Sequence, residues 1–313
     1  MRIAVAGSGR LAAGALARLL NSTHEIAAVV ESGRRSGIER KADALLSAAL
    51  SPGATPGGMA LRRGIPIVYL DRMDAEELAP LARTEPDLLL VAGFGVILKR
   101  PVLDLLRIGC VNCHSSLLPR HRGPNPFQAV ILAGERQSGV TFHIMTEGID
   151  DGDIVAQYAF DLDEDDTAGA VYAKSAEVLH ARVVEVMDQI EREGLHGTPQ
   201  RPEDATYDRR LEGDDLLFRW SRPARALERL VRACRPFDTP GFTHRGRIVF
   251  VLRATCADEA VDAPPGTVVE SVPRVVIAAG QGALRIEQAF TRSPLPWIWP
   301  PFLGRPRPGD RIG

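Results

Sequence analysis

The chain has 313 residues, 45% of them hydrophobic, and a formal net charge of −2. This length and apolar content suffice for a full hydrophobic core and favour two domains over one. The near-neutral total excludes a global electrostatic attraction to nucleic acid or to an anionic membrane. A run of about 18 apolar residues, which would predict a membrane-spanning helix, is absent from the sequence.

The charge is unevenly distributed along the chain. Residues 205–313 contain 17 arginines and 12 acidic residues, so they carry about five excess positive charges, and residues 1–204 are correspondingly acidic. A basic second domain permits an anionic partner without requiring one. The apolar N-terminus imitates a signal peptide, but Gly7 and Gly9 favour a first strand and turn, and therefore a cytoplasmic protein.

Short apolar strands alternate with helices over the first two thirds of the chain. Strands are predicted over residues 2–6, 26–30, 66–69, 88–92, 109–112, 139–145 and 153–160, and helices over 10–21, 40–48, 74–84, 101–106 and 167–193. This alternation predicts an α/β domain with a doubly wound, Rossmann-like parallel sheet. Functional groups are then expected beyond the carboxyl ends of the strands.

The last third predicts a different domain. After a polar stretch, a helix over 222–234 precedes short strands over 247–253, 266–271, 274–278 and 283–288, separated by glycine and proline. Short strands in roughly 90 residues are typical of a small OB-like β-barrel. We therefore predict an α/β domain over 1–194, a linker over 195–221 and a β-barrel domain over 222–313.

The first turn resembles a dinucleotide-binding fingerprint. Gly7-x-Gly9-x-x-Ala12 is followed by Glu31 about 20 residues later, as in NAD-binding sheets. Any doubly wound sheet also needs a tight first turn, so the same glycines fit a turn with another ligand or with none. An NAD-binding oxidoreductase stays open as a minor alternative.

Several motifs invite a metal or haem interpretation. Cys110, Cys113 and His114 match the pattern for covalent haem attachment, but they close a buried strand in a chain whose cysteines are expected to be reduced and structural. A zinc site there lacks a second cluster of ligands. The acidic loop with Asp150, Asp151 and Asp153 has too few alternating oxygen ligands for calcium and could also be a solvated turn. We expect no metal.

Asn112 and His114 are the strongest candidates for chemistry. They lie at positions i and i+2, so their side chains share one face where the predicted strand ends. A carboxylate of the acidic loop that pairs with His114 explains that loop better than a metal does. Ser116 lacks the surrounding pattern of a nucleophilic serine and is interpreted as a loop former. His143 fits a place in the same cleft or a structural role equally well.

Taken in order, these motifs resemble the 10-formyltetrahydrofolate-dependent formyltransferase family across the whole first domain. The matching positions are Asn112-x-His114-x-Ser116-Leu117-Leu118-Pro119 with Gly123, then Gly139-Val140-Thr141-x-His143 and Asp150-x-Gly152-Asp153. The second domain is similar to the small barrel of methionyl-tRNA formyltransferases and of some sugar-amine formyltransferases. Its matching stretches are Ala205-Thr206-Tyr207, Val231-Arg232-Ala233, Pro240-Gly241 and Pro265-Gly266-Thr267-Val268.

The resemblance implies a site that moves a formyl group from 10-formyltetrahydrofolate to an amine. Asn112 would donate to the tetrahedral oxyanion, His114 would donate or carry the proton, and Asp150 would orient the histidine and raise its pKa. The folate pocket is implied at Phe94, Gly95, Val96, Ile97, Leu98, Met145, Thr146, Glu147, Gly148 and Ile149. Acceptor contacts are expected from Gly7, Ser8, Gly9, Ser116, Arg122, Gly123 and His143.

The acceptor substrate is predicted from the positions at which this sequence differs from methionyl-tRNA formyltransferases. Residues 33–63 carry basic side chains, but in an Ala-rich sequence unlike the basic loop of methionyl-tRNA formyltransferases. Residues 124–127 read Pro-Asn-Pro-Phe where those enzymes typically have Ala-Ala-Pro-Ile, and the tail over 294–301 also differs. We therefore expect a small-molecule amine, such as an amino sugar nucleotide or a hydroxyornithine-type intermediate. Initiator methionyl-tRNA is the alternative and the less expected partner, and formyltetrahydrofolate hydrolysis or an inactive binding module are minor ones.

Overall fold

The computed structural model describes residues 1–33, 55–257, 261–272, 274–291 and 306–312. The chain divides into two compact units. The first unit comprises residues 1–126, 137–161 and 172–208, and the second comprises 127–136, 162–171 and 209–313. The division at 194 and 222 stays a prediction about domains in the sequence.

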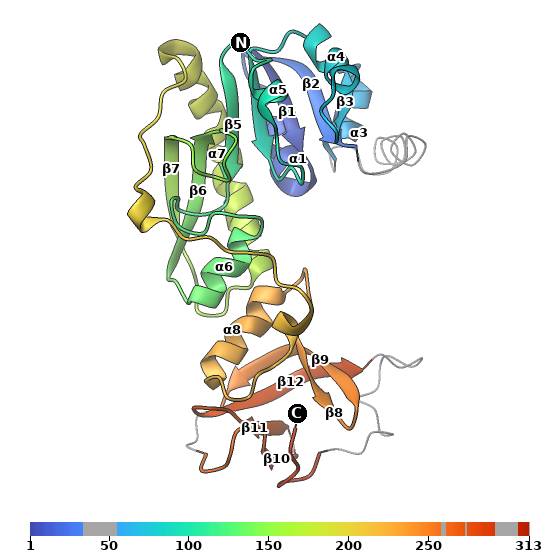
Figure 1. Ribbon diagram of the computed structural model, residues 1–313, viewed down its shortest axis with the longest axis vertical. Coiled ribbons are helices and arrows are strands. Elements are labelled where there is room, and N and C mark those ends of the chain that lie inside the picture. Colours follow the sequence, from blue (N-terminus) through green and yellow to red (C-terminus); the bar gives the residue numbers. More distant parts are fainter. Residues whose placement is uncertain (34–54, 258–260, 273, 292–305, 313) are drawn as a thin grey trace. The chain divides into compact units, whose positions relative to one another are not determined.

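A seven-stranded sheet forms the centre of the first unit (Figure 1). Its strands are β1 (Arg2–Gly7), β2 (Glu25–Ser32), β3 (Ile67–Leu70), β4 (Leu88–Ala92), β5 (Gly109–His114), β6 (Gln137–Ile144) and β7 (Ile154–Asp161). The order is β3-β2-β1-β4-β5-β6-β7; β1 to β5 are parallel, and β6 and β7 are antiparallel to their neighbours. The strand order reverses between β1 and β4, where an open sheet of this type presents its ligands.

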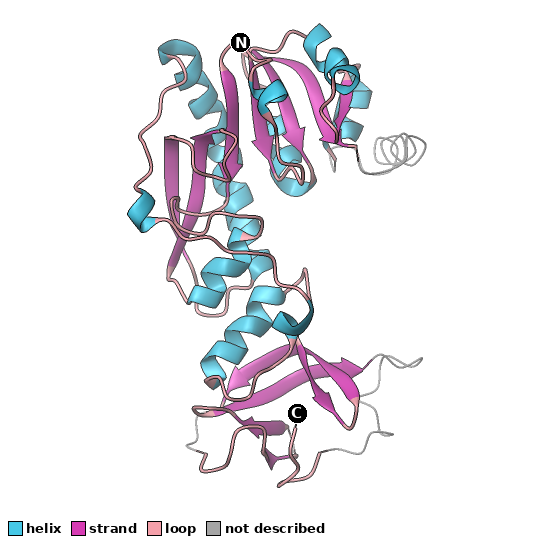
Figure 2. Cartoon of the chain, viewed as in Figure 1, coloured by secondary structure: helices cyan, strands magenta, loops and turns pink. Residues whose placement is uncertain are grey.

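Helices cover both faces of this sheet (Figure 2). They are α1 (Gly9–Leu19), α3 (Pro56–Arg63), α4 (Ala75–Arg83), α5 (Arg100–Leu103) and α7 (Ala168–Glu193). Strand β4 shows the consequence for the core, because Leu88 and Leu90 join one buried cluster while Leu89 and Val91 join the other. A side-chain period of two places alternate residues on opposite faces, so a strand buried on both faces is apolar throughout.

The second unit contains a five-stranded antiparallel sheet of order β10-β11-β12-β9-β8. The strands are β8 (Gly241–His244), β9 (Arg247–Cys256), β10 (Val268–Glu270), β11 (Val275–Ala278) and β12 (Ala283–Thr291). Helix α8 (Ala224–Cys234) shares one hydrophobic cluster with them. The remaining elements are α6 (Pro126–Ala133) and the 3-10 turns η1 (Pro202–Asp204) and η2 (Gly213–Leu216). The predicted fold class is confirmed: a Rossmann-like sheet followed by a small β domain.

Helix α3 was not predicted, because its first turn reads Pro56-Gly57-Gly58 and glycine is a poor helix former. Local contacts compensate for this. The Thr55 side chain accepts a hydrogen bond from the Gly58 N–H, and Gly64 ends the helix in the left-handed conformation. The predicted helix over 40–48, the basic residues of 34–54 and the tail over 294–301 lie outside the described residues. Among the helices that are described, none is long and apolar enough to cross a bilayer.

Candidate active site

Strands β5 and β6 bring the predicted catalytic side chains to one end of the first unit's sheet. Asn112 lies opposite His143 and His114 lies opposite Thr141 in the antiparallel register. The loop that follows β6 then returns Asp150 to the end of β5. The sequence folds this way because alternate residues of β5 face the same side, so Asn112 and His114 emerge together where the strand ends.

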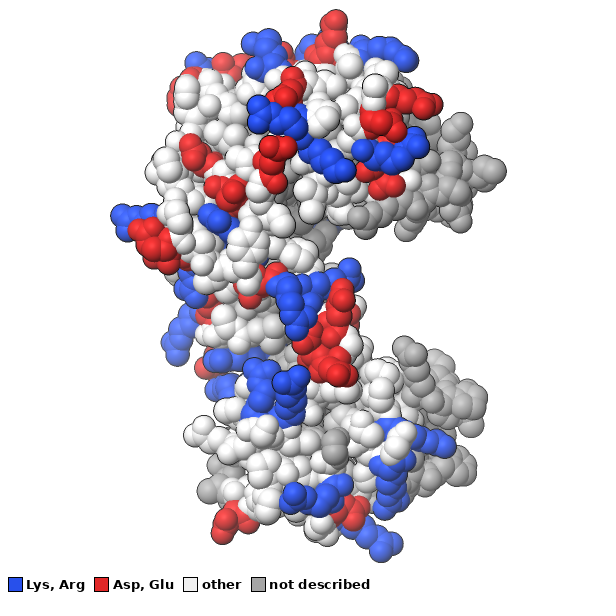
Figure 3. Space-filling model, viewed as in Figure 1, with Lys and Arg blue, Asp and Glu red and all other residues white. Residues whose placement is uncertain are grey.

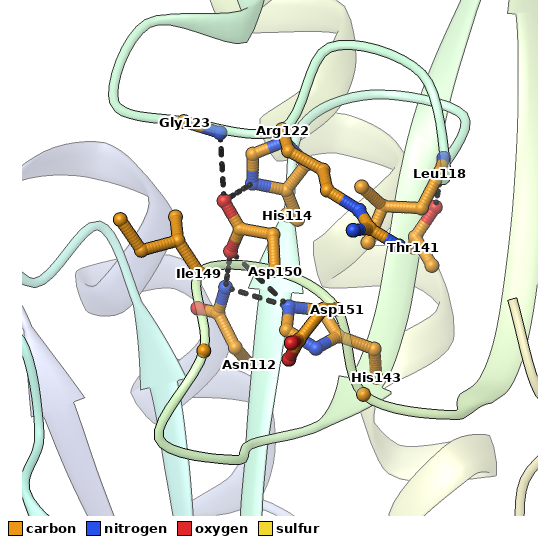
Figure 4. A network of polar contacts seen from close by, with 12 residues as sticks. Asn112, His114, Leu118, Arg122, Gly123, Thr141, His143, Ile149, Asp150 and Asp151 are labelled. Carbon is orange, nitrogen blue, oxygen red and sulfur yellow. Dashed lines mark hydrogen bonds and ion pairs between the residues drawn. The ribbon is translucent and has the colours of Figure 1, made fainter. Parts of the chain in front are cut away.

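Asp150 is the centre of the resulting network (Figure 4). Its Oδ2 accepts a hydrogen bond from the Gly123 N–H at 2.9 Å and lies 3.6 Å from His114 Nδ1. Its Oδ1 lies 3.4 Å from both Asn112 Nδ2 and His143 Nε2. The predicted trio and two predicted acceptor residues, Gly123 and His143, therefore meet around one carboxylate.

The Asp150 carboxylate is held in its ionised form. Burial alone would raise its pKa, but the hydrogen bond with His143, the charge of His114 and the N–H of Gly123 outweigh burial and lower the pKa to about 2. The side chain is only 14% exposed, so these contacts act with little screening by water. A fixed negative charge is thus present beside His114 throughout the neutral pH range.

His114 presents one defined nitrogen to this carboxylate. Its Nε2 lies 2.8 Å from the backbone carbonyl of His121, which can only accept, so Nε2 carries the proton and Nδ1 is the titrating atom. Burial lowers the pKa of the ring more than the charge of Asp150 raises it. Asp150 acts in the expected direction, yet the net shift is downward because burial contributes most. Burial thus favours the neutral form of His114, with the lone pair on Nδ1.

Asn112 and His143 are coupled through one contact of 3.1 Å between Asn112 Nδ2 and His143 Nε2. His143 Nδ1 lies 3.0 Å from the carbonyl of Ile144 and donates to it, while Nε2 faces both the Asn112 amide and Asp150 Oδ1. A reversed Asn112 amide would place its oxygen against Asp150, so the carboxylate fixes the amide orientation. The two amide hydrogens thus point to His143 and, at a longer distance, to Asp150.

The loop after His114 is anchored on β6 and β7. Thr141 Oγ1 donates to the Ser116 carbonyl at 2.7 Å and accepts from the Leu118 N–H at 3.2 Å. Gln157 on β7 donates both to Thr141 Oγ1 and to the Leu118 carbonyl. Ser116 itself is fully buried, and its hydroxyl donates to the Arg120 carbonyl. These bonds support its interpretation as a loop former; its acceptor contact stays a prediction.

Residues after α7 complete the site, and sequence reasoning assigned them no role. Gln200 contacts Arg122 and the backbone of the Asp150 loop, and Thr206 accepts a hydrogen bond from the His121 N–H at 2.8 Å. The Asp208 carboxylate lies 2.8 Å from His121 Nδ1. The only signal for this region was the match at Ala205-Thr206-Tyr207. Nothing in the sequence around Gln200 distinguishes it from an exposed linker residue.

The two segments expected to bind folate follow β4 and β6. Phe94, Val96 and Met145 pack against the same hydrophobic cluster, to which Leu98 belongs. Ile97, by contrast, is 65% exposed. The backbone of Met145 is tied to β5 by a hydrogen bond from its N–H to the Cys110 carbonyl. The remaining folate residues, Gly95, Thr146, Glu147, Gly148 and Ile149, are exposed on these loops. Their contacts with folate stay predictions.

The first turn is arranged differently from a dinucleotide site. Ser8 bonds the Gly93 carbonyl through both its N–H and its hydroxyl, which joins this turn to the loop after β4. The Tyr172 hydroxyl accepts from the amides of Arg10 and Leu11, where a pyrophosphate would bind. Glu31, expected on a ribose, accepts instead from the Gly57 N–H at the start of α3. Both arrangements oppose the NAD alternative; the acceptor role of Gly7, Ser8 and Gly9 stays a prediction.

The cysteine motif is not arranged to hold an ion. Cys110 and Cys113 belong to the hydrophobic clusters on opposite faces of the sheet. Burial raises the pKa of the Cys110 thiol to about 12 and that of Cys113 further. Among the described residues, one group could share a metal ion, His24 with Asp188 and Glu191, and it lies outside the catalytic network.

Comparisons with known proteins match formyl transferases in both the first and the last part of the chain. A family model described as formyl transferase matches residues 1–187, and one described as formyl transferase, C-terminal domain, matches residues 210–293. The methionyl-tRNA formyltransferase of Pseudomonas paraeruginosa is 36% identical over 299 residues, covering 95% of this chain and 92% of the relative. That of Methylococcus capsulatus is 33% identical over 288 residues, covering 91% of each.

Solved structures with the same fold include two sugar-related formyltransferases. WlaRD, a sugar 3N-formyl transferase solved with dTDP and 5-N-formyl-THF, has a TM-score of 0.68 at 21% identity, covering 94% of this chain and 99% of that one. The N-formyltransferase of Helicobacter canadensis, in complex with folinic acid and dTDP-3-aminofucose, has a TM-score of 0.68 at 19% identity, covering 92% and 99%. At these identities the likeness concerns the fold alone.

Proposed function

We infer that this chain, which belongs to the formyl transferase family, transfers the formyl group of 10-formyltetrahydrofolate to the amino group of initiator methionyl-tRNA. The similarity to methionyl-tRNA formyltransferases carries this proposal, because it extends at 36% identity over 95% of the chain and so includes both domains. The arrangement of Asn112, His114 and Asp150 supports the same chemistry independently of any relative.

The expectation of a small-molecule amine was wrong, and so was the statement that tRNA is the less expected partner. Relatives at 33–36% identity over at least 91% of this chain are methionyl-tRNA formyltransferases. The sugar formyltransferases share the fold at about 20% identity, which says nothing about the acceptor. The local departures at residues 124–127 and in the tail carried less information than the whole-chain similarity.

The proposed reaction uses the network without a covalent enzyme intermediate. The methionyl amine attacks the formyl carbon, and the carbonyl oxygen becomes an oxyanion that the Asn112 amide stabilises. Asn112 then exchanges its longer contact, the 3.4 Å one with Asp150, for the oxyanion. His114 Nδ1 takes a proton from the attacking nitrogen and returns it to N10 of the folate as the carbon–nitrogen bond breaks. The products are N-formylmethionyl-tRNA and tetrahydrofolate.

Asp150 supplies the charge that this proton transfer needs. When His114 takes the proton it becomes a buried cation, which is costly without a partner. The Asp150 carboxylate, ionised at neutral pH and 3.6 Å from Nδ1, offsets that cost. The same carboxylate keeps the ring and the Asn112 amide in the orientation that the reaction uses.

Charge is compatible with an RNA acceptor. Basic side chains predominate over the second unit on the face that Figure 3 shows, whereas both signs are mixed over the first. Residues 205–313 carry the excess of 17 arginines over 12 acidic residues. Contacts between such side chains and phosphates give binding that weakens steeply with salt. A cytoplasmic location, where charged initiator tRNA is available, is part of this proposal.

The test is incubation of the protein with 10-formyltetrahydrofolate and a panel of acceptors. The panel contains initiator methionyl-tRNA, elongator methionyl-tRNA, free methionine, an amino sugar nucleotide and hydroxyornithine, and products are identified by mass. We expect a gain of one formyl group on initiator methionyl-tRNA. Formylation of a small amine with none of the tRNA would refute the proposal. Release of formate without any formylated acceptor would point instead to a hydrolase.

A further inference from the structure

The segment over residues 198–208, which we call the linker segment, is bonded to both loops that build the active site. Thr198 forms a two-way bridge with Ile154, each hydrogen bond being 2.8 Å long. The Arg122 N–H donates to the Thr206 carbonyl, and the Asp208 N–H donates to the Arg122 carbonyl, both at 2.9 Å. The linker segment thus passes along the residues that surround Asp150 and is hydrogen-bonded to them.

Gln200 makes the most direct connection in the linker segment. Its Nε2 donates to the carbonyls of Asp150 and Gly152 at 2.8 and 2.7 Å. Its Oε1 accepts from Arg122 Nε and Nη2 at 3.2 and 2.8 Å. Both hydrogens and both lone pairs of the amide are used. A reversed amide would set oxygen against two carbonyls and NH2 against a guanidinium, so the orientation is fixed by chemistry.

The backbone that Gln200 holds is one that needs support. Asp150 has a φ of 53°, in the left-handed region that non-glycine residues seldom adopt. Such a conformation is strained for a residue with a side chain and persists where surrounding contacts maintain it. Gly152 is equally constrained, since an added Cβ would lie 1.9 Å from the Ile144 carbonyl oxygen. The two bonds from Gln200 hold the carbonyls on both sides of Asp151.

Gln200 also connects the two halves of the carboxylate's environment. One half is the loop that carries Asp150. The other carries Arg122, the neighbouring Gly123 N–H that bonds Asp150 Oδ2, and the His121 carbonyl that bonds His114. A side chain that binds the first half as donor and the second as acceptor fixes the distance between them.

We propose that Gln200 is a positioning residue that holds the Asp150 carboxylate against His114 and the Gly123 N–H. This inference rests on the catalytic role of Asp150 in the proposed function, but not on the identity of the acceptor. The Gln200 amide is fully occupied by Arg122 and by the carbonyls of Asp150 and Gly152, so its loss should lower the rate of transfer and leave the binding of folate and acceptor nearly unchanged.

Two variants separate positioning from packing. Gln200→Met keeps the length of the side chain and removes all four hydrogen bonds. Gln200→Glu keeps the two bonds from Arg122 but turns oxygen toward the carbonyls of Asp150 and Gly152. The matched control is Gln137→Leu, because Gln137 also donates from its amide, to Asp161 on the neighbouring strand β7, but lies at the other end of β6 from His143. Thermal melting compares the stability of all variants.

We expect kcat to fall about 10- to 100-fold in both Gln200 variants, since small displacements of catalytic groups have effects of this size. Both KM values should stay within about twofold of wild type, and Gln137→Leu should behave as wild type. Wild-type kcat in Gln200→Glu would overturn the proposal, because the bonds with Arg122 alone would then suffice.

The deciding readout is the titration of the His114 ring by NMR, which does not depend on any acceptor. Burial lowers the pKa of His114 and Asp150 raises it, so Asp150→Asn should shift the titration to lower pH. Gln200→Met should shift it in the same direction. A His114 titration unchanged in Gln200→Met would overturn positioning even if kcat fell. If instead the shift occurs while the wild-type enzyme leaves methionyl-tRNA unformylated, the proposed acceptor fails and the role of Gln200 stands.

Discussion

Replacing Asp150 with asparagine tests the electrostatic part of the mechanism. The amide is nearly the same size as the carboxylate but removes the negative charge that lies 3.6 Å from His114 Nδ1. Opposite unit charges at this distance attract by about 4 to 5 kcal/mol at an effective dielectric constant of about 20. If half or all of this attraction develops as His114 takes the proton, its loss slows transfer by roughly 50-fold to 2,000-fold.

The assay is single-turnover formylation of initiator methionyl-tRNA with saturating 10-formyltetrahydrofolate. We expect the rate constant of Asp150→Asn to fall within that range while the binding of both substrates changes little. Asp151→Asn is the matched control, because its carboxylate is the sequence neighbour, is exposed, and bonds Thr146 outside the His114 network. A rate within threefold of wild type for Asp150→Asn, or an equal loss in Asp151→Asn, would refute the reasoning.

Three further predictions follow from the same contacts. Asn112→Ala should lower kcat by about 10²- to 10³-fold with little change in either KM, because one donor to the oxyanion is lost. An unchanged kcat in steady-state kinetics would exclude Asn112 from the mechanism. The pKa of Asp150 is lowered to about 2 from an ordinary 3.8, so its ionised form stabilises the fold by about 2 kcal/mol above pH 4. This stabilisation is lost as the pH falls toward 2, so in urea unfolding the wild type should lose more stability than Asp150→Asn over that window. Parallel curves of unfolding free energy against pH would contradict the prediction. Three of the four cysteines are buried with raised pKa values, namely Cys110, Cys113 and Cys234, and Cys256 is partly exposed. A thiol reagent at pH 8 should therefore label at most one cysteine in the native protein. Rapid labelling of two or more would contradict the burial.

The cluster of side chains around Asp150 could be predicted in part because its members carry their own signals. Asn112 and His114 stand two residues apart at the end of an apolar strand, and strand geometry alone places them on one face. The acidic loop supplied Asp150 through a motif. Gln200 could not be found this way, because its role depends on where the chain returns after α7 and not on its neighbours in sequence. The same holds for Tyr172, whose hydroxyl occupies the first turn of α1 from 162 residues away.

Two of the elements that were missed share one physical reason. Helix α3 begins with two glycines and depends on the caps Thr55 and Glu31, and strand β8 has only four residues, so both are decided by tertiary contacts that override weak local preference. The acceptor was misjudged for a related reason. Residues that recognise an acceptor are not fixed by the chemistry of transfer, and a few departures at 124–127 outweighed the similarity of the whole chain in that prediction.

The proposed function is tested most directly by comparing wild type with His114→Ala in formylation of initiator methionyl-tRNA, together with the binding of a folate analogue. We expect N-formylmethionyl-tRNA from the wild type, a loss of transfer of at least about 100-fold in the variant, and equal folate affinity in both. Normal turnover by His114→Ala, or the absence of formylated tRNA with the wild-type enzyme, would contradict it.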